Sequence, residues 1–212
     1  MKLHPIASSI AIAAAFLCGA AHADTTYTNT AAVGAPIYQL GAPDTTSYGE
    51  FFTAPGGVLK SFTFQALSGQ SGNVDLTIAA WDGSKPVGPA LYTSAPISYN
   101  GGVQYLGASG INLTLTAGTN YIAYLTVAGV SSPISNVTVA GSNSDGGLGG
   151  GFRFLNSAGA DPLTQASSWS SWGTPAMAYT ATFAAAVPEP ETYGMLLAGL
   201  ALVGVMARRK RA

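Results

Sequence analysis

The sequence predicts an all-β ectodomain, an antiparallel two-sheet β-sandwich of jelly-roll type, between an N-terminal signal peptide and a single C-terminal transmembrane helix. Three observations lead to this prediction. Short runs in the middle of the chain alternate apolar and polar residues with a period of two, as half-buried strands do. Glycine-rich turns separate these runs. An apolar run lies near each end of the 212-residue chain, and only 8% of all residues are charged.

The first 23 residues have the layout of a secretory signal peptide. Lys2 gives a weakly positive start, residues 6–20 are apolar, and Ala21 and Ala23 are the small residues that signal peptidase recognises. We therefore predict cleavage before Asp24. A retained membrane anchor is the alternative, but the apolar run is shorter than the ~20 residues that span a bilayer.

Cleavage there removes Cys18, His4 and His22, so the mature chain contains neither cysteine nor histidine. This excludes nucleophilic catalysis by a Ser–His or Cys–His pair, and metal sites built from thiolates or imidazoles. Lipid attachment at Cys18 is another alternative, although Leu17 stands where a small residue is expected.

The ectodomain, residues 24–186, carries few charges. Seven acids stand against three bases, which gives a net charge of −4. The acids are Asp24, Asp44, Glu50, Asp75, Asp82, Asp145 and Asp161, and the bases are Lys60, Lys85 and Arg153. Three scattered cations cannot neutralise a run of phosphates, so no nucleic acid is expected as a partner.

Five runs predict the strands of the sandwich. They are residues 58–64, 73–78, 111–116, 121–127 and 177–183. In the first run, Val58, Phe62 and Phe64 are expected to share the inner face. In the second, Val74, Leu76 and Ile78 are expected to point inward, and Asp75 and Thr77 are expected to face solvent. The fourth run is apolar on both faces, as in a central strand covered on both sides.

Turn signals separate these strands: residues 55–57, 82–84, 100–102 and 117–120. Residues 141–151 are rich in glycine, but neither a Lys-Ser/Thr ending nor a helix follows, so the segment is not a phosphate-binding loop. We expect a flexible loop there, before a strand at residues 152–155.

The C-terminal tail, residues 187–212, has three parts. Pro188 and Pro190 lack amide hydrogens and keep the peptide extended. Residues 192–207 are apolar and would form a helix about 24 Å long at 1.5 Å per residue. Four basic residues follow, Arg208, Arg209, Lys210 and Arg211. Such a cluster stays on the cytoplasmic side, which puts the ectodomain outside the inner membrane.

This tail resembles the PEP-CTERM sorting signal of Gram-negative bacteria. The resemblance rests on the box Val187-Pro188-Glu189-Pro190, the apolar helix and the basic cluster. It implies recognition of the box by an exosortase, a membrane-embedded cysteine transpeptidase that removes the helix, in bacteria that make exopolysaccharide and biofilm. A plain single-helix tail anchor is the alternative.

The middle of the chain resembles a recurring exported bacterial β-sandwich module without assigned chemistry. The matching segments are residues 51–59, 80–83, 88–92 and 115–121. The module is similar in outline to carbohydrate-binding jelly rolls, but a shared fold does not imply a shared function.

Aromatic residues suggest a carbohydrate-binding alternative. Trp81, Trp169 and Trp172 could stack on the apolar face of a sugar, and Tyr99 and Tyr105 could assist. The segment 167–172 is expected to expose two indoles among hydroxyl groups. The alternative is that these rings only cap the ends of the sandwich.

Two further alternatives concern carboxylates. Asp75 and Asp82 are the candidate pair for a glycoside-active enzyme, which needs one acid with a raised pKa. Asp82, Asn143 and Asp145 offer hard oxygen ligands for calcium, without EF-hand spacing.

We therefore expect an exported, non-enzymatic, exosortase-processed protein of the cell surface or extracellular matrix. Its role would be structural or adhesive in the exopolysaccharide or biofilm layer, with no cofactor unless calcium binds. The expected partners are signal peptidase, exosortase, the inner membrane before processing, and extracellular polysaccharide.

Overall fold

The computed structural model describes residues 23–43, 45–173 and 175–184, and the single positions 194, 199, 200 and 203. The predicted signal peptide up to residue 22, the sorting box and the basic cluster lie outside the described residues. Within the described part, the chain forms two six-stranded antiparallel sheets and one two-stranded sheet. The predicted antiparallel two-sheet sandwich is therefore confirmed, whereas its jelly-roll connectivity stays a prediction.

The first sheet is built around the long strand β4. One edge of β4 pairs with β8, and the other pairs with β14 and then with β10. Strand β1 adds to β14, and β2 adds to β10. The strands are β1 (Thr25–Thr28), β2 (Ile37–Leu40), β4 (Gly57–Gln70), β8 (Gln104–Leu115), β10 (Ser135–Val139) and β14 (Tyr179–Ala184).

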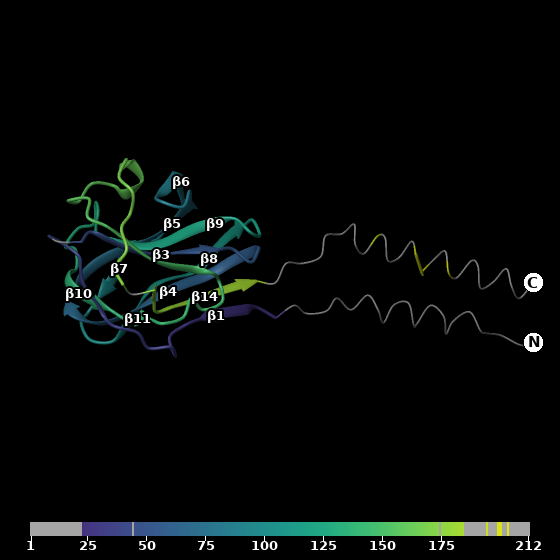
Figure 1. Ribbon diagram of the computed structural model, residues 1–212, viewed down its shortest axis with the longest axis horizontal. Helices are drawn as coiled ribbons and strands as arrows, with labels where there is room; N and C mark the ends of the chain where they lie inside the picture. The colour runs from purple at the N-terminus through teal and green to yellow at the C-terminus, as the bar shows by residue number, and fades with distance from the viewer. Residues whose placement is uncertain are drawn as a thin grey trace, which may run out of the picture.

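The second sheet has the order β12-β3-β9-β5-β6, and β7 continues the outer edge of β5 beyond β6. Figure 1 shows the two layers, with β3, β5 and β9 above β4, β14 and β1. The strands are β3 (Ser47–Thr53), β5 (Gly72–Trp81), β6 (Pro86–Thr93), β7 (Ile97–Tyr99), β9 (Asn120–Thr126) and β12 (Gly150–Leu155).

The main core lies between the two sheets. Strand β4 contributes Leu59, Phe62 and Phe64, all fully buried, and β9 contributes Tyr121 and Leu125. A second, smaller hydrophobic cluster lies on the outer face of the second sheet. It includes Ile122 and Tyr124 of β9. Strand β9 therefore has packed side chains on both faces, as its sequence predicts.

The inner face of β4 differs from the prediction. Leu59 is fully buried, whereas Val58 is only partly buried. The register shifts between Leu59 and Ser61 against β8, and again opposite this point on β14. A bulge adds one residue on one strand and so reverses the alternation. The expectation for Val58 is therefore wrong, and Lys60 points away from the core.

Two other segments also differ from their predicted form. The run 177–183 is divided at Ala178 into β13 (Ala176–Met177) and β14, and β13 pairs with β11 (Gly141–Ser142). The expected loop at 141–151 therefore opens with a short strand, and it places Leu148 in the core. The connection after β12 contains a 3₁₀ turn, η1 (Pro162–Thr164), which contacts β6.

Candidate functional site

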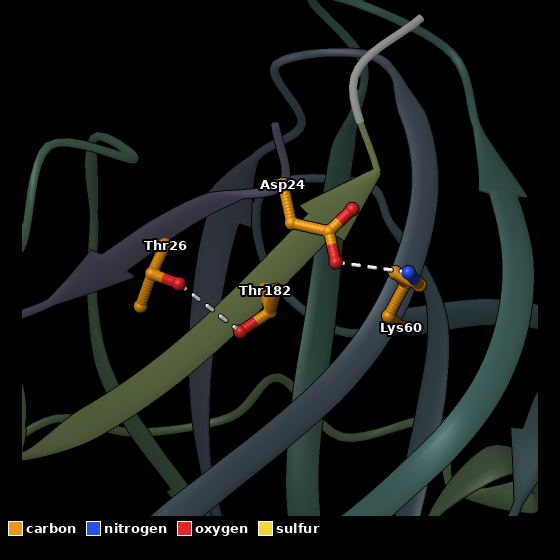
Figure 2. Close-up of polar contacts among 4 residues, drawn as sticks. All are labelled: Asp24, Thr26, Lys60 and Thr182. Atoms are coloured by element: carbon orange, nitrogen blue, oxygen red, sulfur yellow. Dashed lines mark hydrogen bonds and ion pairs between the residues drawn. The ribbon is translucent and has the colours of Figure 1, made fainter. Parts of the chain in front are cut away.

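The points where the folded domain begins and ends lie side by side. Strands β1 and β14 are antiparallel neighbours, with Thr25 opposite Phe183. The Oγ1 atoms of Thr26 and Thr182 are 3.3 Å apart, and Asp24 Oδ2 lies 2.9 Å from Lys60 Nζ; Figure 2 shows both contacts. This ion pair is about half exposed, so it contributes little to stability. The ion pair holds Asp24, the residue before β1, beside Lys60 of β4.

Both predicted processing points are close to this end. Cleavage before Asp24 would leave one residue ahead of β1, which begins at Thr25. At the other terminus, β14 ends at Ala184, and only Ala185 and Ala186 separate it from Val187. Ala21 and the residues of the box lie outside the described residues.

Residues 186–211 match the family model described as the PEP-CTERM protein-sorting motif. The chain carries this sorting motif. The PEP-CTERM motif implies an exported protein of the cell envelope or surface that is targeted by an exosortase. The comparisons with curated proteins and with solved structures gave no match. In the described part of the chain, no helix has both the length and the apolar character needed to cross a membrane.

Two of the three tryptophans belong to the core. Trp81 and Trp169 are each 6% exposed, and their rings meet edge to face at 6.1 Å. Trp169 also packs against Tyr124 at 5.2 Å, and its backbone nitrogen donates to Ser84 O at 2.8 Å. The expectation that segment 167–172 exposes two indoles is therefore wrong for Trp169. Together with Trp81, it attaches the segment that follows β12, here called the covering loop, to the outer face of the second sheet.

Trp172 keeps 42% of its surface exposed. Its ring lies 4.6 Å from Phe154 and 5.7 Å from Phe152, so one face is supported by β12. Stacking of a sugar on Trp172 stays a prediction. Tyr105 is also exposed, whereas Tyr99 is buried.

Asp75 and Asp82 are too far apart to form a glycosidase pair. Asp82 follows the end of β5, seven residues beyond Asp75, so their Cα atoms are about 23 Å apart at ~3.3 Å per residue. Paired catalytic carboxylates lie ~5–10 Å apart. Asp82 Oδ1 accepts from the amides of Lys85 at 2.8 Å and Ser84 at 2.7 Å. These bonds lower the pKa of Asp82.

The other calcium candidates are also engaged in hydrogen bonds within the protein. The side-chain amide of Asn143 donates to Val33 O at 2.8 Å, and Asp145 Oδ1 accepts from Gly147 N at 2.9 Å. Among the described residues, no group of three acids, histidines or cysteines is arranged to hold a metal ion. Calcium binding by Asp82, Asn143 and Asp145 stays a prediction.

Glu50 of β3 is a buried acid that the sequence analysis only counted as a charge. It is 1% exposed and lies on the core side of β3, between Tyr48 and Phe52. Its Oε2 accepts from Met177 N at 2.9 Å, while Oε1 is buried without a hydrogen-bond partner. The alternation with these two aromatic residues was a signal that could have placed Glu50 inside.

Burial raises the pKa of Glu50 well above its ordinary value. The hydrogen bond from Met177 and the charge of Arg153 oppose this shift, and Asp145 reinforces it. Because the folded state holds the proton more tightly, this contribution to stability is complete below pH ~4.3, the ordinary pKa of an unfolded glutamate. It is lost as the pH rises towards the raised pKa.

Glu50→Gln should therefore flatten the pH dependence of stability. In the wild type, the free energy of unfolding should fall above pH ~4.3, by at most about 1.4 kcal/mol per pH unit. Glutamine cannot ionise, so this part of the slope should disappear when urea unfolding is followed from pH 4 to 9. Asp82→Asn is the control, since the pKa of Asp82 is lowered, and it should keep the wild-type slope above pH 5. An unchanged slope in Glu50→Gln would contradict the assignment.

Proposed function

We propose that this is an exosortase-processed protein of the surface or extracellular matrix of a Gram-negative bacterium, with a structural or adhesive role in the exopolysaccharide or biofilm layer. In this proposal the ectodomain is not an enzyme and needs no cofactor. The observation that carries the proposal is the PEP-CTERM motif at residues 186–211, directly after the last strand of the sandwich.

The geometry of the domain supports this role. Because β1 and β14 are neighbours, the chain enters and leaves the domain at one end. That end faces the membrane while the tail is attached, and the rest of the sandwich extends outward. The surface carries few charges, which suits contact with hydrated, uncharged polymers rather than with nucleic acid.

Fractionation of the producing bacterium tests the proposal. The processed protein should co-purify with the polysaccharide-containing matrix, and deletion of its gene should weaken cohesion of that matrix under shear. Complementation with the wild-type gene should restore cohesion, whereas complementation with a chain truncated before Val187 should not. Recovery of the processed protein entirely as free protein in the medium, with matrix cohesion unchanged by the deletion, would refute the role.

A further inference from the structure

A polar pocket lies on the outer face of the second sheet, beside the cluster that contains Trp81 and Trp169. Its volume is about 230 Å³. The floor consists of two facing pairs of side chains: Asp75 of β5 lies opposite Thr126 of β9, and Thr77 lies opposite Tyr124. This face of the sheet therefore carries a polar platform of four side chains, with one carboxylate, two threonine hydroxyls and one phenol.

The walls of the pocket come from two other segments. Strand β6 provides Ala90 and Thr93, and the start of η1 provides Asp161, Pro162 and Leu163. Because β6 and η1 contact each other, the pocket is bounded on two sides above the platform. No lysine or arginine is among its lining residues. The site therefore combines an acidic, hydroxyl-rich floor with small apolar walls.

Asp75 lines this pocket, and one oxygen of its carboxylate has no hydrogen-bond partner. Its Oδ1 is shielded from solvent and has no hydrogen-bond partner in the structure. Burial raises the pKa of Asp75, which agrees with the lack of a compensating donor. A buried carboxylate oxygen without a donor is unfavourable, and such groups in native proteins call for an explanation. A ligand that donates hydrogen bonds to the carboxylate group would compensate for this missing donor.

The remaining polar groups favour hydroxyl groups over a metal ion. Asp161 Oδ1 already accepts from Leu163 N at 3.0 Å, and Thr126 Oγ1 accepts from Ser47 at 2.8 Å. Calcium takes six to eight oxygen ligands, and these occupied atoms leave too few. The volume is below the ~300–1,000 Å³ of pockets for drug-sized ligands, which fits a single sugar ring.

We propose that this pocket binds one neutral, hydroxyl-rich glycosyl unit of a polysaccharide, with Asp75 accepting hydrogen bonds from its hydroxyl groups. Thr93 lines the rim, and Pro162 and Leu163 contact the apolar face of the ring. The inference deepens the adhesive role proposed above and rests on it for the source of the sugar.

Saturation-transfer-difference NMR on the mature protein purified from its host tests this site. The probes are glucose, galactose, mannose and N-acetylglucosamine, and oligosaccharides released from the polysaccharide of the same strain by partial hydrolysis. At least one probe should receive saturation transfer from the wild-type protein. Asp75→Asn and Thr93→Val should each weaken that binding at least tenfold. Asp82→Asn, an acid outside the pocket, should bind as the wild type does.

Asp75→Asn should also melt at or above the wild-type temperature, because it removes a carboxylate that lacks a donor. Loss of binding without loss of stability separates a binding role from a structural one. Thr93→Val provides the same comparison at an exposed wall position, should Asp75→Asn fold poorly.

Three outcomes would overturn the proposal: no saturation transfer to any probe, equal binding in Asp75→Asn and the wild type, or loss of binding only in Trp172→Ala. The proposed ligand class would be wrong if no sugar binds and calcium raises the melting temperature of the wild type but not that of Asp75→Asn. Matrix cohesion is measured separately, so failure of this site and failure of the proposed function can be distinguished.

Discussion

Replacement of Pro188, Glu189 and Pro190 together by alanine should leave the protein in the inner membrane with its basic tail attached. Alanine restores the amide hydrogens and the helical freedom that proline removes, so the predicted apolar helix should extend through the box. A helical peptide hides its backbone from a protease-like active site. Intact-mass spectrometry of membrane fractions should find the chain ending at Ala212 in place of the processed form.

The structure makes this test strict. Three residues separate the end of β14 at Ala184 from Pro188, so the Cα atoms of Ala184 and Pro188 are at most about 14 Å apart. The box is therefore presented immediately beside the folded domain. Thr192→Ala, just beyond the box, is the matched control and should be processed normally, and deletion of the host exosortase should reproduce the triple substitution. A wild-type chain found intact to Ala212 in exosortase-positive cells would show that the tail is an ordinary anchor.

Phe62→Ala should cause the largest loss of folding stability among single core substitutions, about 3–5 kcal/mol. Phe62 is fully buried, and its ring contacts Phe64 at 5.1 Å, Tyr179 at 5.3 Å and Phe52 at 5.6 Å. Truncation leaves a cavity between the two sheets that these rings cannot fill. Because domains of this size are stable by only ~5–15 kcal/mol, urea unfolding should show a large shift of the midpoint.

The neighbouring pair Leu59 and Val58 tests the bulge in β4. Leu59→Ala should cost about 2–5 kcal/mol, since Leu59 is fully buried, whereas Val58→Ala should cost under about 1 kcal/mol. A strand without the bulge would reverse this order. Equal losses at the two positions, measured under the same conditions, would contradict the register shift.

The sequence alone was sufficient for the strands that follow a regular period. Val74, Leu76 and Ile78 are fully buried as predicted, and β9 is central as predicted. The bulge at Lys60 was not predicted from the sequence, because an extra residue reverses the alternation of inward and outward side chains without changing the composition. Lys60 on the expected apolar face was the one local sign of it.

The pocket and the covering loop were also beyond sequence reasoning. Thr77 was expected to face solvent, yet it is 4% exposed, because the segment that follows β12 covers this face of the sheet. Asp75 and Asp161 line one pocket although 86 positions separate them in the chain. No periodicity connects such residues. The sorting tail was the opposite case, since its order of box, apolar run and basic cluster is local and could be recognised directly.

The position of β14 has a mechanical consequence. Strand β14 lies between β1 and β4, and hydrogen bonds join it to both along its length. A pull on the C-terminal end of the domain, directed along the strand, therefore loads two ladders in shear, and many bonds must break together. A pull that separates the two neighbouring ends from each other would instead open the β1–β14 ladder one pair at a time. The sandwich should thus resist force through its C-terminus far better than force applied between its two ends.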